Sequence, residues 1–283
     1  MRRAPVFLIS LAALLAAACV AYVDELPAQG RGGTTIVSAP FGDLDAGAAQ
    51  LDSLHFSLRA YGSDTARRIS EHAEGLYNRI MMDTNLYSFR PRGLYQIVVY
   101  ASQAEYRKKT GQPEWSGGVA VGNAIYSFEG PGLPGTLAHE ITHLIFYEYM
   151  GTVNIQHRWV NEGLAVYEEN KAALQRAGAS SADADLEKRW ASARGRLRQQ
   201  PIPMDQMIDL TPATEREYTV NVWYAQAESM VRYMIERGGR MGVSQFLAAL
   251  RDGRSFDEAV SSSFVGVWKN LAEFEQSWQG SLQ

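Results

Sequence analysis

Two histidines four residues apart flank a glutamate in the segment "TLAHEITHLI", residues 136–145. On an α-helix, residues four apart differ by about 40° in direction and about 6 Å in height, so His139 and His143 project side by side. Two imidazoles placed in this way can share one tetrahedral ion such as zinc. Glu140 lies to the side of the pair, where a general base can reach a water on the ion without displacing a ligand.

A hydrolytic zinc site needs a third protein ligand, because such sites keep the fourth position open for water. The segment "RWVNEGLAVYEEN" supplies Glu162, with eighteen residues between it and His143. This glutamate falls in a second predicted helix, in which Gly163 and Ala165 leave room for close helix packing. Glu162 is therefore the candidate third ligand.

Together these residues form H-E-x-x-H followed by N-E-G-L-A, which resembles the signature of the gluzincin metallopeptidases. The spacing to Glu162 is that of the M1-type aminopeptidase clan. The runs "HFSLRAYG", "IVVYASQAEYRKKTG" and "GRSFDEAVSSSF", with a closing tryptophan-containing helix, are similar to stand-alone bacterial peptidase MA-like domains over about residues 51–283. This resemblance implies an α+β fold with a thermolysin-like core. In the fold that the resemblance implies, a small mixed or antiparallel sheet would pack on the metal helix and a helical lobe would close the cleft.

The resemblance also implies roles for the motif residues. Glu140 would be the base that deprotonates a zinc-bound water, because zinc lowers the pKa of that water and polarises the scissile carbonyl. The implied zinc ligands are His139, His143 and Glu162.

An oxyanion donor is implied as well, since related enzymes add a tyrosine or histidine from the later helical region. The segment "EREYTVNVWYAQAESMVRYM" offers Tyr224 as the better match and Tyr218 as the second. Tyrosines in an aromatic-rich helix are also common core residues, so a structural role stays open for both.

The ring nitrogen of a ligating histidine that does not bind the metal donates its N–H to an acceptor. Asn161 and Thr142 are candidates for this acceptor because they are next to ligands in the sequence. Each is equally suited to helix capping or to the surface. His157, a lone histidine in the loop before the ligand helix, is expected to be exposed to solvent. His55 and His72 have no motif around them, and we assign them no role.

The stretch "SGGVAVGNAIYSF" precedes the metal helix by about the interval that separates the substrate-binding edge strand from the metal helix in related enzymes. An extended peptide can add to such an edge by backbone hydrogen bonds. The aminopeptidases of the clan carry a glutamate in a G-x-M-E-N segment, whereas residues 119–123 supply no acid. We therefore expect an endopeptidase that acts on a peptide or an unfolded protein. The alternatives are a catalytically silent envelope lipoprotein that uses the cleft for binding or assembly, and a zinc hydrolase of a non-peptide bond.

The first nineteen residues read as an export signal: a basic start, an apolar run over residues 4–15, and alanines before Cys19. The end, "LAAAC", resembles a lipobox with Ala16 where leucine is usual. Lipidation at Cys19, cleavage after Ala18 and an uncleaved anchor are the alternatives. We expect an exported protein, periplasmic or held at the outer side of a membrane by this anchor alone. No other cysteine follows, so the mature chain has no disulfide.

The remaining 264 of the 283 residues divide into a tether and one domain. Residues 20–50 are rich in glycine, alanine, aspartate and proline, which is typical of a flexible tether. Residues 51–283 form the expected peptidase domain, and a hydrophobic content of 46% is ample for its core. The net charge is −4 with no basic stripe, so we expect no nucleic-acid partner. Oligomeric state is left open.

Apolar periodicity places strands before helices along the domain. Strands are expected over 51–62, 93–102 and 117–128, and helices over 64–83, with Asp64 as its cap, and over 103–111. After Pro134 the pattern is helical. This order favours an α+β domain over a βαβ repeat. The later helices are expected over 135–150, 158–175, 183–197, 218–237, 242–251, 255–263 and 267–280.

Overall fold

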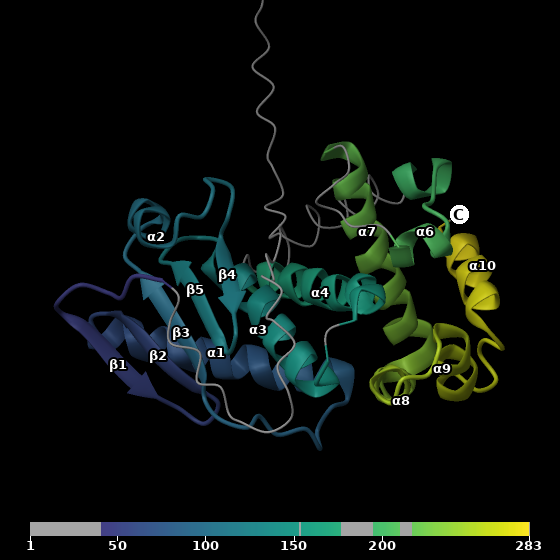
Figure 1. Ribbon diagram of the computed structural model, residues 1–283, viewed down its shortest axis with the longest axis horizontal. Coiled ribbons are helices and arrows are strands. Elements are labelled where there is room, and N and C mark those ends of the chain that lie inside the picture. Colours follow the sequence, from purple (N-terminus) through teal and green to yellow (C-terminus); the bar gives the residue numbers. More distant parts are fainter. Residues whose placement is uncertain (1–40, 153, 177–194, 210–216, 283) are drawn as a thin grey trace, which may run out of the picture.

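The computed structural model describes residues 41–152, 154–176, 195–209 and 217–282 (Figure 1). The predicted export signal, most of the predicted tether and most of the helix expected over 183–197 lie outside these residues. Among the helices described, none is both long and apolar enough to cross a membrane.

Five strands form one mixed sheet in the order β1-β2-β3-β5-β4. The inner pairs β2–β3 and β3–β5 are parallel, and the outer pairs β1–β2 and β5–β4 are antiparallel. The class predicted from the sequence, α+β with a small mixed sheet, is confirmed. The strands are β1 (Ala48–Asp52), β2 (Phe56–Tyr61), β3 (Tyr95–Tyr100), β4 (Gly118–Val121) and β5 (Ala124–Phe128).

Apart from Gln96, the central strand β3 consists of apolar and aromatic residues, because both of its faces are covered. Ile97 and Val99 join the main core of the molecule, whereas Val98 and Tyr100 join a second cluster that includes Tyr106 of helix α2 (Gln103–Thr110). Strand alternation therefore divides one apolar run between two cores.

The sequence predicted an α+β domain and not a βαβ repeat, yet this mixed sheet contains parallel neighbours, which need crossover connections. Helix α1 (Ser63–Thr84) connects β2 to β3, and α2 lies between β3 and the β4–β5 hairpin. The stretch expected as one strand over 117–128 is that hairpin, because Gly122 takes a φ of 63° at the turn. Likewise the strand expected over 51–62 is part of a hairpin that begins at Ala48, inside the expected tether.

The helices follow the predicted spans closely, with two differences. Asp64 lies in the first turn of α1 and is not its cap, since Gly62 is the N-cap. Helix α6 (Met204–Asp209) is an addition. The other helices are α3 (Leu133–Met150), α4 (Arg158–Arg176), α7 (Glu217–Tyr233), the π-helical turn η3 (Met234–Gly238), α8 (Gly239–Arg251), α9 (Phe256–Ser263) and α10 (Leu271–Ser281), with a 3-10 turn η1 (Ile155–His157) before α4.

Helices α3 and α4 lie between the sheet and the helices α7 to α10 (Figure 1). Helix α3 packs on β4 and β5, and a Cβ atom at Gly118 of β4 would lie 2.5 Å from Cγ2 of Thr136 on α3. One face of the edge strand β4 therefore packs directly against α3.

Helix α4 is held on two further sides. Arg79 of α1 and Glu168 of α4 form a buried ion pair of 2.8 Å, and Lys171 pairs with Asp83 of α1. On the side of α7, a Cβ atom at Gly163 would lie 2.5 Å from the backbone oxygen of Ala227. Only glycine at position 163 permits this approach of the two helices.

We predict that Gly163→Ala destabilises the fold by about 1–3 kcal/mol, because the added methyl group must push α7 away from α4. Gly75→Ala is the matched control: it is an exposed glycine within α1 whose added Cβ meets nothing within 4 Å. That control should stabilise the protein by about 0.5–1 kcal/mol. Urea unfolding measures both, and equal effects would contradict the close packing of α4 on α7.

Candidate metal centre

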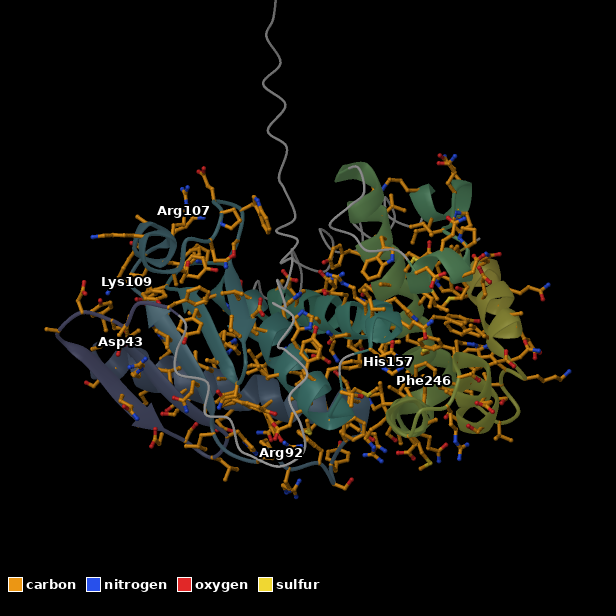
Figure 2. All side chains as sticks on the ribbon, viewed as in Figure 1. Asp43, Arg92, Arg107, Lys109, His157 and Phe246 are labelled. Carbon is orange, nitrogen blue, oxygen red and sulfur yellow. The ribbon has the colours of Figure 1, made fainter. Side chains whose placement is uncertain are left out.

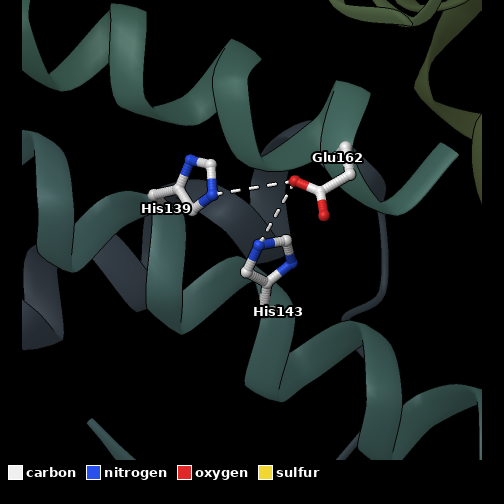
Figure 3. Close-up of side chains that lie close together, drawn as sticks. All are labelled: His139, His143 and Glu162. Atoms are coloured by element: carbon white, nitrogen blue, oxygen red, sulfur yellow. Dashed lines mark ion pairs between the residues drawn. The ribbon is translucent and has the colours of Figure 1, made fainter. Parts of the chain in front are cut away.

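The structure brings the three predicted ligands together. His139 and His143 come from α3 and Glu162 comes from α4, and all three side chains are buried (Figure 3). Glu162 Oε2 lies 3.9 Å from His139 Nε2 and 3.6 Å from His143 Nε2. One donor atom from each residue lies within 4.8 Å of the others, so the group can hold a metal ion.

Two hydrogen-bond acceptors fix the orientation of the His139 and His143 rings. His143 Nδ1–H donates to Asn161 Oδ1 at 3.0 Å, and His139 Nδ1–H donates to Glu169 Oε2 at 3.0 Å. Because an amide oxygen and a carboxylate only accept, each ring carries its proton on Nδ1. The Nε2 lone pairs are therefore the ones that face Glu162, as a metal site requires.

The three converging atoms lack hydrogen-bond partners among the described residues. Nε2 of both histidines and Oε2 of Glu162 are buried and form no hydrogen bond within the described part of the chain. Leaving such atoms unsatisfied costs about 1–3 kcal/mol each. A divalent ion bound by two imidazoles and one carboxylate would satisfy all three at once, so the residues present fit a metal.

Burial and charge move the pKa values of the three ligands in different directions. Burial acts to lower the pKa of His139, but Glu169 and the other nearby acids raise it to about 9. Burial, and then the charge of His139, lower the pKa of His143 to about 3. Burial raises the pKa of Glu162 to about 7.

Glu140 is completely buried beside this group. Its charge contributes to the raised pKa values of both His139 and Glu162. The carboxylate therefore lies within electrostatic reach of the site without being one of the three converging ligands.

The structure separates the two candidate acceptors. Asn161 accepts from His143 as predicted. The Thr142 hydroxyl instead donates to the backbone oxygen of Ala138 at 2.7 Å, so it has no part in orienting a ligand.

The expected exposure of His157 is wrong. This residue closes the 3-10 turn before α4, is buried, and meets the ring of Phe256 edge-on at 5.8 Å. Figure 2 shows it at the side of α8 and α9, near Phe246. Contact with these helices removes the histidine from solvent, which local sequence does not show.

Tyr224 is a buried residue of α7, with its ring edge-on to Trp223 at 5.2 Å. It lies one turn before Ala227, whose backbone covers Gly163 next to the ligand Glu162. Its role as oxyanion donor stays a prediction. The side chain of Tyr218 lies outside the described residues.

Three residues near the site were not predicted from the sequence. Glu169 and Arg158 lie on the same face of α4 as Glu162, at i+7 and i−4, so helical periodicity was an available signal. Tyr147 lies one turn after His143, with ring centroids 6.1 Å apart. Burial raises the pKa of Tyr147, as does the charge of Glu162, while an interaction with Asn161 acts to lower it.

Compared with known proteins, the chain matches no protein-family model and no curated protein. The residues of the site and their geometry are therefore what supports a function.

We predict that Glu169→Gln weakens metal binding by about 10- to 100-fold, because the carboxylate that orients His139 loses its charge. Competition with a chelator measures the affinity. Glu71→Gln, at an exposed position of α1, is the control and should bind metal as the wild type does. Unchanged affinity in Glu169→Gln would show that the hydrogen bond to His139 does not support the site.

Proposed function

We propose that this protein is a zinc-dependent metallopeptidase that hydrolyses peptide bonds in extended or unfolded chains. The observation that carries the proposal is the buried group of His139, His143 and Glu162, whose unsatisfied donor atoms converge beside Glu140. Two histidines and one carboxylate are a donor set that catalytic zinc sites use with an open fourth position.

The chain's own residues suit this chemistry. A zinc ion held here would supply a Lewis acid that polarises the scissile carbonyl and lowers the pKa of water. Glu140 takes up the proton of the attacking water and passes it to the leaving amine. Asn161 and Glu169 keep the imidazoles in the ligating orientation. Tyr224 is proposed as the donor to the developing oxyanion.

The substrate is proposed to bind along β4 as an added strand. Strand β4 pairs only with β5 among the described strands, so its other side offers backbone groups to an extended chain. It lies against α3 through Gly118 and Thr136, close to the helix that carries the histidines. This arrangement supports a thermolysin-like core and an endopeptidase.

Export through residues 1–19 and anchoring at Cys19 complete the proposal. They would place the enzyme on the outer side of a bacterial membrane, where unfolded envelope proteins are its substrates. No nucleic acid takes part.

We predict that Glu140→Gln retains zinc but hydrolyses casein about a hundredfold to ten-thousandfold more slowly, because the amide cannot accept the proton. His139→Ala is the matched variant and should lose both zinc and activity. Metal analysis of purified proteins and a casein assay give the two readouts.

The outcomes separate the alternatives. Zinc in the wild type without hydrolysis of casein would favour a silent binder or a hydrolase of another bond. Equally negligible zinc in the wild type and His139→Ala would remove the metalloenzyme proposal. Full activity in Glu140→Gln would show that Glu140 is not the general base.

We predict that Tyr224→Phe lowers kcat roughly a hundredfold to a thousandfold with zinc content unchanged, because it removes one oxyanion donor. Tyr233→Phe, later on α7, is the control, since its hydroxyl is bonded to Ser277. Equal kcat values for Tyr224→Phe and the wild type would show that Tyr224 is a core residue and not an oxyanion donor.

A further inference from the structure

Arg158 is a half-buried cation beside the metal centre. It is the first residue of α4 and lies one helical turn before Glu162, so the two side chains project from the same face. Burial dominates the pKa values of Glu162 and His143, and the charge of Arg158 acts to lower both. The charge of the guanidinium therefore reaches the ligands.

None of the described residues forms an ion pair with this guanidinium. Its backbone N–H donates to the oxygen of Ile155, but its side chain forms no hydrogen bond with the described part of the chain. Every other arginine or lysine that is buried or half-buried there is paired with a carboxylate. These paired cations are Arg59, Arg79, Lys109, Lys171 and Arg232.

The position is unfavourable for the helix itself. The N-terminal end of a helix carries partial positive charge, which favours acids and disfavours arginine. The first turn of α4 contains no acidic residue that could compensate. Arginine at this position weakens the helix, and it lies next to the candidate metal centre. Residues that break a local rule in this way are expected mainly at functional sites.

We propose that Arg158 binds a carboxylate group of the peptide substrate beside the scissile bond, an inference that rests on the proposed peptidase function. The planar guanidinium donates two parallel hydrogen bonds to a carboxylate, and partial burial strengthens the attraction. That carboxylate belongs either to the C-terminus of the peptide or to an acidic side chain. The first source gives a peptidase that trims chain ends, and the second gives an endopeptidase selective for acidic sequences.

The test compares matched pools of short synthetic peptides, with glutamate or glutamine inside and with a free or amidated C-terminus. In the wild type, one of the two exchanges should lower kcat/KM by roughly 10- to 100-fold, the effect of losing a hydrogen-bonded charge pair. Arg158→Gln should remove this preference, and Arg158→Lys should restore part of it. Arg237→Gln, which removes an exposed charge, should keep it. A preference that persists in Arg158→Gln, or none in the wild type, would overturn the inference.

A binding experiment makes the result independent of catalysis. Calorimetric titration of the same pools into zinc-loaded Glu140→Gln, with and without Arg158→Gln, should show the same loss of preference. If the peptides bind through Arg158 but the wild type cleaves none of them, the peptidase proposal fails and the role of Arg158 stands. If the wild type cleaves all pools equally well, the peptidase proposal stands and the role of Arg158 fails.

Stability and zinc content exclude a structural role. Since the side chain of Arg158 pairs with none of the described residues and opposes the helix dipole, Arg158→Gln should unfold at the same or a higher temperature than the wild type and bind as much zinc. A lower unfolding temperature, or weaker zinc binding with the peptide preference intact, would show that Arg158 serves the fold or the metal and would overturn the inference.

Discussion

Three lone pairs meet in the protein interior with no described group that donates a hydrogen to them. They belong to Nε2 of His139 and His143 and to Oε2 of Glu162. Such an arrangement costs folding free energy unless a cation occupies the space between them. Much of the surrounding structure can be understood as what keeps these atoms in place, since the two helices that carry them must be held in one relative position.

Helix α4 is held by contacts on several sides at once. Two adjacent glutamates of α4 contact different helices: Glu168 forms an ion pair with Arg79 of α1, and Glu169 accepts a hydrogen bond from His139 of α3. Gly163 allows the backbone of α7 to close on the helix directly after the ligand Glu162. A small displacement of α4 would therefore disturb an ion pair, the acceptor of a ligand and a close helix contact together.

The electrostatics of the site are uneven around this centre. Both histidines lie next to Glu162, but His139 also has Glu169 and Glu140 nearby and a raised pKa, whereas the other ring nitrogen of His143 meets the neutral amide of Asn161 and the pKa of His143 is low. The charge of Arg158 acts on His143, and its side chain has no ion-pair partner among the described residues. Under the proposed function, a bound peptide would meet the base Glu140 and the cation Arg158 at different places in the site.

Sequence periodicity alone placed the main helices and the candidate ligands, because residues four apart share a helix face whatever surrounds them. The same periodicity places Glu169 and Arg158 on the helix face of Glu162, although neither residue was predicted to belong to the site. It did not show that the segments over 51–62 and 117–128 belong to hairpins, that β2, β3 and β5 run parallel, or that His157 is buried. These features depend on which segments become neighbours and on what covers them, so they arise from long-range packing. The tertiary structure alone decided that the ligand atoms converge, that Asn161 and not Thr142 orients His143, and that Arg158 pairs with no acid in the described segments. Each of these depends on contacts between residues far apart in the chain or on their absence.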